Sequence, residues 1–386
     1  MRSSYKKEDV VLLLKDITGL VKPQPASERE RLIQSGKHYC EMLPIEYVPS
    51  EKYMQAYEEA LEVFAEPTAR AVEVLAEKIV RSRGRSAVLV SLARAGIPAG
   101  ILLKRYLKWN AGIDMAHYAV SVIRGRGIDK NAMRYLLARY QPQQLLFIDG
   151  WIGKGAILQE LKKSMADFAG VSPELAVLAD PANVTALCGT HEDILIPSSC
   201  LNCTVSGLIS RTFLRSDIIG EKDFHGAVYY GELEQADLSY AYIKAVEKHF
   251  TKRAWETGPQ SSAPFQELEQ DSRMEGLEAG LKNSRAVQKR KPDSSGGAAG
   301  CGMDEVLEIA RYFSIEDINL IKPGIGETTR VLLRRVPWKV LASHSCQKDR
   351  RLQHIFRLAE EKGVPVETYP LRRYQCCGII KKLSDV

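Results

Sequence analysis

Short apolar runs and helical stretches alternate along the first 250 residues. The runs that predict strands are residues 86–93, 116–123, 144–150, 175–180 and 226–233. The stretches with the three- and four-residue apolar spacing of helices are residues 99–109, 130–140 and 155–168. Strands that alternate with helices predict an α/β domain with a mostly parallel sheet. Residues 8–81 are expected to form a mostly helical N-terminal cap on this sheet.

The pattern changes after residue 250. Residues 251–303 contain few bulky apolar side chains and many Gly, Ser, Pro and Ala residues. Such a stretch cannot bury enough surface to offset its chain entropy, so we expect a flexible linker. From residue 304 the helix and strand patterns resume and predict a second, small α/β domain over residues 304–386. The first domain is expected to span residues 1–250.

Charge is distributed unevenly between these parts. The whole chain carries a net charge of +6, yet from residue 322 onward there are fourteen Lys and Arg against six Asp and Glu. A basic C-terminal domain on a near-neutral body favours an anionic polymer as its partner. No apolar run approaches the roughly 20 residues of a membrane helix, so no membrane partner is expected. Eight cysteines in 386 residues are too sparse for a disulfide scaffold and indicate reduced thiols in the cytoplasm.

Three loops that follow predicted strands carry candidate ligand-binding residues. In a parallel α/β sheet, ligands bind at the carboxyl ends of the strands, where loops and helix N-termini offer backbone donors. The loop residues are Ala93, Arg94, Ala95 and Gly96 in the first loop, Arg124 and Arg126 in the second, and Asp149, Gly150, Gly153, Lys154 and Gly155 in the third. Small residues let backbone N–H groups approach a phosphate, and arginine adds a charge-assisted contact. Asp180 follows another strand and is a candidate contact for an acceptor substrate.

The order of these loops resembles the type I phosphoribosyltransferases. Residues 92–96 match their pyrophosphate loop, residues 124–129 their flexible loop, and residues 147–156 their phosphoribosyl-diphosphate loop. The resemblance implies a transferase that binds phosphoribosyl diphosphate with Mg²⁺. Arg94 would hold the pyrophosphate, and Asp149 would steady the ribose and its developing charge. Gly150 stands where that family usually has a second acid.

Nearly all of the first domain also resembles the bacterial StiP-like family of tellurite- and stress-resistance proteins. The stretches that carry the resemblance are residues 35–50, 91–107, 121–129, 148–157, 177–182 and 192–212. It implies a phosphoribosyltransferase-like domain that acts in a bacterial stress or tellurite-resistance pathway. Some descriptions of the family name a cysteine protease instead.

The cysteines between residues 188 and 203 leave several interpretations open. Cys188, His191, Cys200 and Cys203 have spacings that could ligate zinc, but a predicted buried strand separates the two pairs, and we predict no metal site. The protease description makes Cys200 a nucleophile and His191 its base. The interpretation that we favour makes Cys200 a small residue packed near the substrate pocket. A non-catalytic sensor of nucleotides and RNA is a further alternative, in agreement with Gly150 in place of an acid.

The C-terminal domain resembles the ribosomal-protein L7Ae and pelota RNA-binding fold. A Gly-rich turn opens a predicted helix after residue 323, and the residues expected to contact RNA are Gly324, Glu327, Thr328, Arg330 and Arg334. A helix N-terminus with exposed amides and nearby arginines suits phosphate contacts. Gly326 stands where that family has Asn. The resemblance implies RNA binding, and the scarcity of aromatic residues for stacking favours structured RNA.

Overall fold

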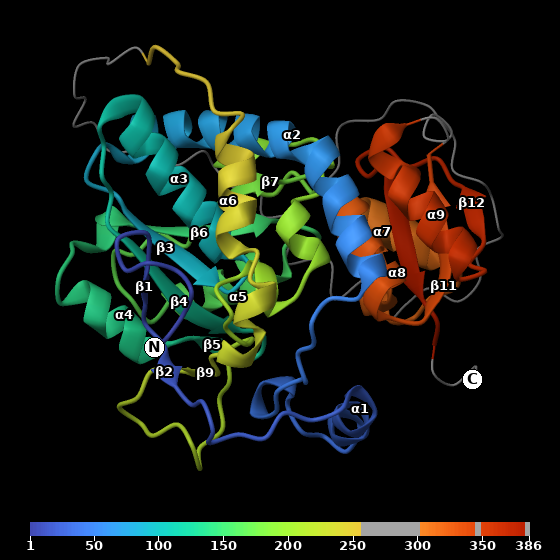
Figure 1. Cartoon of the computed structure of the whole chain (residues 1–386), viewed down its shortest axis with the longest axis horizontal. Coiled ribbons are helices and arrows are strands. Elements are labelled where there is room, and N and C mark those ends of the chain that lie inside the picture. Colours follow the sequence, from blue (N-terminus) through green and yellow to red (C-terminus); the bar gives the residue numbers. More distant parts are fainter. Residues whose placement is uncertain (256–301, 344–348, 383–386) are drawn as a thin grey trace.

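Seven strands in the described part of the first domain form one sheet. The structure is a computed structural model that describes residues 1–255, 302–343 and 349–382 (Figure 1). The strands are β1 (Val11–Leu12), β3 (Val88–Ala93), β4 (His117–Ile123), β5 (Gly127–Ile128), β6 (Leu145–Trp151), β7 (Leu175–Ala179) and β8 (Cys188–Thr190). Six of them run parallel in the order β1-β4-β3-β6-β7-β8, while β5 pairs antiparallel with β4. The mostly parallel α/β architecture that the sequence predicts is confirmed.

Alternate side chains of these strands face two different layers of helices. In β3, Leu89 packs into one apolar core, whereas Val88 and Val90 pack into another. The first core is covered by α2 (Glu51–Arg83), α3 (Gly96–Ala111) and α6 (Ser239–Glu247), and the second by α4 (Lys130–Leu137) and α5 (Ala156–Met165) (Figure 1). Because helices cover both faces of the sheet, its strands appear in the sequence as continuous apolar runs.

The N-terminal segment is less helical than we expected for residues 8–81. Helix α1 (Ala26–Gln34) and helix α2 are present, but β1 and β2 (Lys15–Asp16) occupy residues 11–16. β1 pairs with β4 at one edge of the sheet, and β2 pairs with β9 (Gly226–Ala227). The edge of β4 presents backbone groups that need partners, and β1 supplies them. Such long-range pairing overrides the local helical spacing.

The C-terminal domain is a small sheet with helices. Its elements are α7 (Gly302–Tyr312), β10 (Ile321–Pro323), α8 (Ile325–Arg334), β11 (Pro337–Ala342), α9 (Gln353–Glu361), β12 (Val366–Thr368) and β13 (Cys376–Ile380). The strands lie in the order β10-β13-β11-β12, with β13 antiparallel to both of its neighbours. The chain turns after α9 at Gly363, where φ is +63° and glycine is the natural residue.

The two domains are joined through one continuous apolar core. α2 has 33 residues, about 50 Å at 1.5 Å per residue. One part of it covers the sheet of the first domain, and its N-terminal part packs against the C-terminal domain (Figure 1). There the hydroxyl of Tyr53 donates to the carbonyl of Leu333, and Glu59 pairs with Arg357. None of the helices within the described ranges is both long and apolar enough to cross a membrane.

The residues at the two ends of the expected linker belong to the domains. The backbone N–H of Thr251 donates to buried Glu73 of α2 at 2.7 Å, and the Nε of Arg253 donates to the same carboxylate at 3.0 Å. Trp255 packs against the core of the first domain, and Gly302 already begins α7. Residues 256–301, which the linker prediction also covers, lie outside the described residues.

We expect Glu73→Ala to lower the free energy of unfolding by about 3 kcal/mol, the order seen when one partner of a buried charge pair is removed. The substitution leaves Arg253 and Thr251 without their shared acceptor. Chemical denaturation of the full chain measures the effect. Glu66→Ala is the matched control, because Glu66 lies on the same helix and pairs with Arg70 only at the surface. Equal losses in the two variants would contradict the anchoring role of Glu73.

Candidate functional site

The chain reverses its direction of travel across the sheet between β3 and β6. From β3 it crosses to β4 on one side and then returns to β6 on the other side. Ser91 near the end of β3 is paired with Ile148 of β6, so the loops that follow these strands lie side by side. In open α/β sheets such a switch point forms the crevice where ligands bind. Two of the three predicted loops therefore meet at the expected place.

The small residues of the first loop allow α3 to lie close to β6. A Cβ at Gly96 would collide with the carbonyl oxygen of Ile148, so only glycine fits this contact. Ala93 ends β3, and Ala95 precedes α3 with its side chain exposed. Gly96 thus allows α3 to pack closely against β6.

Arg94 is held at this loop by neighbours from distant parts of the chain. One Nη donates to the Glu46 carboxylate at 3.1 Å and to the Ile209 carbonyl at 2.8 Å. Its side chain is 19% exposed. A guanidinium has five N–H donors, so these two bonds leave others for an anion.

Asp149 lies in β6, two residues before this strand ends at Trp151. Its Oδ1 accepts a hydrogen bond from the Gly150 N–H at 2.8 Å. Burial raises the pKa of Asp149 to about 7, although this hydrogen bond and the charge of Arg330 act in the opposite direction. A carboxyl at a switch point that titrates near neutral pH has the character of a functional group.

The third loop is covered by the C-terminal domain. Lys154 donates from Nζ to the carbonyls of Ile318 and Ile321, at 2.7 and 3.1 Å, and burial lowers its pKa to about 8. The Tyr374 hydroxyl donates to the Gly153 carbonyl at 2.8 Å. Gly155 has φ of +83° and precedes the first turn of α5, whose amide groups have no partner within the helix. Anything bound by this loop would therefore lie between the two domains.

The second loop forms a tight hairpin between β4 and β5. The Arg124 N–H donates to the Tyr39 hydroxyl at 2.9 Å, and its guanidinium donates to Asn319 of the C-terminal domain at 3.2 Å. Arg126 pairs with Glu41 at 3.2 Å. Both arginines are exposed, so the hairpin is within reach of solvent and of the C-terminal domain.

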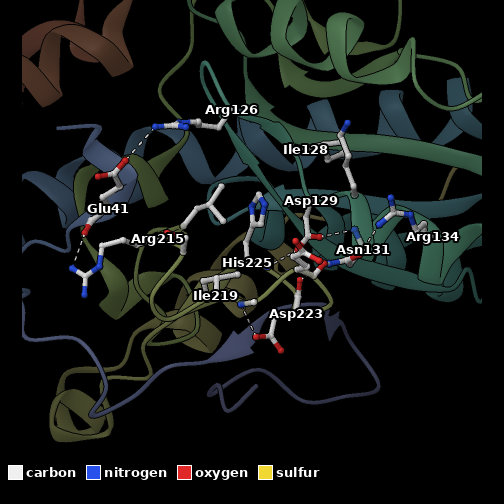
Figure 2. A pocket seen from close by; sticks show the side chains of 15 residues that line it. Glu41, Arg126, Ile128, Asp129, Asn131, Arg134, Arg215, Ile219, Asp223 and His225 are labelled. Atoms are coloured by element: carbon white, nitrogen blue, oxygen red, sulfur yellow. Dashed lines mark hydrogen bonds and ion pairs between the residues drawn. The ribbon is translucent and has the colours of Figure 1, made fainter. Parts of the chain in front are cut away.

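A cavity of about 600 Å³ lies beside this hairpin (Figure 2). Arg126, Asp129, Arg134 and His225 are among its lining residues, and neither Arg94 nor Asp149 is. Two of its polar lining residues, Asp129 and His225, have hydrogen-bond partners within the protein. Asp129 caps α4 through Asn131 and Ala132 and accepts from the His225 N–H, and the His225 ring bonds Ser121. The cavity is therefore separate from the switch point.

Asp180 and His191 come together, but with a different cysteine from the one that we expected. The His191 ring lies 3.3 Å from the sulfur of Cys188 and 2.9 Å from the backbone carbonyl of Asp180. The carboxylate of buried Asp180 accepts the N–H groups of Val184 and Thr185, which fixes the turn after β7. One carboxylate oxygen of Asp180 thus holds the local structure, while its buried Oδ1 has no hydrogen-bond partner among the described residues.

The cysteines of this region are buried thiols. Cys200 is fully buried in the apolar core, and burial raises its pKa to about 12. Cys188 is also fully buried, and burial raises its pKa to about 11. The packing interpretation of Cys200 agrees with this environment. Among the described residues, no group of three or more His, Cys, Asp or Glu side chains could hold a metal ion.

The N-terminus of α8, where RNA phosphate was expected, faces the first domain. Buried Asp193 accepts the N–H of Ile325 at 3.0 Å and that of Gln375 at 2.8 Å. Gly324, with φ of +89°, places the helix against this carboxylate, and Thr328 is fully buried. A carboxylate of the first domain thus occupies the position of an anion at this helix N-terminus.

The remaining residues expected to contact RNA also lie at the interface. Arg334 donates to the three carbonyls of residues 199–201, at 3.3, 3.2 and 2.6 Å. Arg330 pairs with Glu327 at 2.9 Å and lies 5.8 Å from the centre of the Trp151 ring. In this arrangement α8 presents its charged residues to the switch point of the first domain.

Sequence reasoning missed the residues that join the loops to their surroundings. Glu46, Asp193 and Arg211 contact or electrostatically influence predicted site residues from distant positions. The one available signal was their place within the stretches that resemble the StiP-like family, residues 35–50 and 192–212. Their roles depend on long-range packing that no local pattern encodes.

Comparison with known proteins agrees with both resemblances. Residues 3–247 match the family described as "Tellurite-like stress resistance cysteine protease StiP", and residues 300–382 match the "PELOTA RNA binding domain". The chain is 33% identical over 393 residues to the "Cysteine protease StiP" of Acinetobacter baylyi, covering 99% of this chain and 94% of that protein.

A hypoxanthine-guanine phosphoribosyltransferase of Bacillus anthracis is among the similar solved structures. It is 16% identical, and the match covers 36% of this chain and 72% of that chain with a TM-score of 0.20, too low to argue from. The matches that do carry weight are those to StiP, because they span the first domain and, in the curated relative, the whole chain. The chain belongs to the StiP family of tellurite-like stress resistance proteins and carries a C-terminal domain of the PELOTA type.

Proposed function

We propose that this protein is a phosphoribosyltransferase-like enzyme that binds phosphoribosyl diphosphate with Mg²⁺ and acts in a bacterial stress or tellurite-resistance pathway. The observation that carries the proposal is the switch point between β3 and β6, where the Arg94 loop and the loop from Asp149 to Gly155 meet. In this proposal the C-terminal domain binds RNA, as the PELOTA match suggests.

The chemistry follows from the residue types at the switch point. An acceptor nucleophile attacks C1 of the ribose, the bond from C1 to the diphosphate oxygen breaks, and pyrophosphate leaves with the electron pair. Arg94 and the amides at the start of α5 stabilise the leaving diphosphate, and ionised Asp149 accepts from the ribose hydroxyls. The acceptor is an open part of the proposal.

Mg²⁺ enters this proposal with the substrate. Asp149 is followed by Gly150, and the described residues offer no cluster of acids to hold a metal on the protein. Mg²⁺ commonly keeps several waters and binds substrate phosphates. The residues therefore fit a metal that arrives on the diphosphate, and Asp149 would accept hydrogen bonds from its water shell.

A cysteine protease is the second candidate. The pair formed by Cys188 and His191, 3.3 Å apart, favours it, together with the name of the Acinetobacter baylyi relative. A nucleophile with a base in contact is the minimum that such chemistry needs. Burial of the Cys188 sulfur and its raised pKa make this pair less suited to attack than the switch point is to binding.

We expect Arg94→Ala to weaken the binding of phosphoribosyl diphosphate with Mg²⁺ about tenfold or more, because a hydrogen bond to a charged group contributes about 1.5–3 kcal/mol. Isothermal titration of the full chain measures this. Arg85→Ala, at an exposed arginine just before β3, removes the same charge and should leave the affinity unchanged. Binding without release of pyrophosphate in an acceptor screen would favour the sensor alternative.

The affinity for phosphoribosyl diphosphate should rise as pH increases from 6 to 8, because Asp149 ionises near pH 7 in the folded chain. Asp149→Asn should bind more weakly and lose this part of the pH dependence. Titrations of both proteins at several pH values test the expectation. A wild-type pH profile that persists unchanged in Asp149→Asn would exclude this carboxyl as its source.

The same pKa shift predicts the stability of Asp149→Asn. The folded pKa lies above the unfolded value of about 3.9, so the contribution of the carboxyl to stability is present at low pH and lost as pH rises through about 7. Asp149→Asn should therefore raise the Tm more at pH 8 than at pH 5.5. A fall in Tm at pH 8 would show that the carboxylate stabilises the fold.

The protease candidate predicts that Cys188→Ser abolishes cleavage of labelled casein by the full chain. Cys200→Ser should retain cleavage, because His191 contacts Cys188 and Cys200 lies in the apolar core. A wild-type chain that does not cleave casein, or a Cys188→Ser variant that does, would count against this candidate.

A further inference from the structure

We propose that arginines from both domains form one diphosphate-binding site, in which Arg211 of the first domain and Arg330 and Arg334 of α8 act together with Arg94. We call these four residues the interdomain arginine cluster. The inference rests on the proposed function and deepens it, because it makes the C-terminal domain part of the substrate site.

Arg211 is the member that most clearly lacks a counter-charge. Its side chain is half-buried and makes no hydrogen bond or salt bridge with the described residues, while its backbone carbonyl accepts from the Ser210 hydroxyl. Burial, together with the neighbouring charges of Arg29 and Arg94, lowers the pKa of Arg211 to about 10. A half-buried guanidinium without an ion-pair partner keeps its N–H donors available to an anion that reaches the site. Arg211 lies two residues after Ile209, whose carbonyl accepts from Arg94. The two arginines are therefore near each other at the site.

Arg330 reaches the switch point from the other domain. It lies over the ring of Trp151, two residues after Asp149, and its charge acts on the Asp149 carboxyl. A Cβ at Gly153 would stand 3.6 Å from the Cγ of Glu327, so α8 passes directly over the third loop. A diphosphate bound by this loop would therefore meet α8 on its other side.

Arg334 is close enough to Arg330 and Arg94 to be influenced by their positive charges. Burial lowers its pKa to about 10, and Arg330 and Arg94 contribute to the shift in the same direction. Its bonds to the carbonyls of residues 199–201 use Nη2 alone, which leaves other N–H donors of the guanidinium. These carbonyl contacts hold its head group at the domain interface.

The charges at this place do not balance without a ligand. Lys322 adds a further positive charge, because it interacts electrostatically with Arg330 and with Lys154. The nearby carboxylates are Glu46 on Arg94, Glu327 on Arg330, and Asp149, whose raised pKa reduces its negative charge. A diphosphate supplies several negative charges and paired oxygens that suit guanidinium groups, and would offset their mutual repulsion.

The test is isothermal titration of two ligands, inorganic pyrophosphate and phosphoribosyl diphosphate with Mg²⁺, into the full chain. Arg211→Ala and Arg330→Ala should each weaken both ligands about tenfold or more. Arg139→Ala, on the surface of the first domain, and Arg372→Ala, which pairs with Glu308 within the second domain, are matched controls and should bind like wild type. Arg211→Lys and Arg330→Lys keep the charge and should recover part of the affinity. They also replace the alanine variants if those have a lowered Tm.

The outcomes separate this inference from the proposed function. If wild type binds both ligands and the Arg211 and Arg330 variants match the controls, the proposed function stands and the shared site is wrong. If pyrophosphate binding depends on both arginines but phosphoribosyl diphosphate does not bind, the shared site stands and the proposed function fails. If wild type binds neither ligand, both proposals fail.

Discussion

The carboxylate of Asp193 at the N-terminus of α8 fixes how the two domains meet. It is buried, it accepts the backbone N–H groups of Ile325 and Gln375, and burial raises its pKa to about 6. An anion at a helix N-terminus is stabilised by the unsatisfied amides and the helix dipole. With α8 anchored there, Glu327 of α8 lies near Gly153 and Arg330 lies over Trp151. The composition of the candidate site, and the surroundings of Arg330 and Arg334, follow from this contact.

The contacts between α8 and the first domain affect how the RNA-binding prediction applies to the residues of α8. Gly324 lies against Asp193 of the first domain, and Arg334 is bonded to the backbone of that domain, whereas Thr328 is buried against Lys322 and Gly378 of its own domain. RNA contacts through the Ile325 amide beside Gly324 and through Nη2 of Arg334 require displacement of the first domain, because these groups already contact it. The PELOTA-type fold therefore does not by itself assign these residues to RNA, and in this structure they serve the domain interface.

The cysteines show how burial limits chemistry that residue types suggest. A thiol attacks as a thiolate, and a low-dielectric environment without a compensating charge disfavours that form. Burial raises the pKa values of Cys188 and Cys200, and His191 contacts only the first of these. At the switch point the same burial acts on Asp149 and brings its pKa into the range where a carboxyl can respond to pH and ligands. Burial thus raises the pKa of both kinds of group, but it makes the thiols less reactive at neutral pH and brings the carboxyl into its titration range.

The sequence by itself determined the parallel α/β sheet, the C-terminal domain and the loops at Arg94 and Asp149. Apolar periodicity and the order of strands and loops are local features of the sequence. In a parallel sheet the strands end at the same edge, so the loops that follow them are brought together there. Only the tertiary structure decided that residues 11–12 and 15–16 form strands, that His191 meets Cys188, and that Asp193 caps α8. These contacts join residues far apart in the chain, or depend on which side of a turn a side chain faces. Their energy comes from burial and from satisfying distant backbone groups, which no local pattern records.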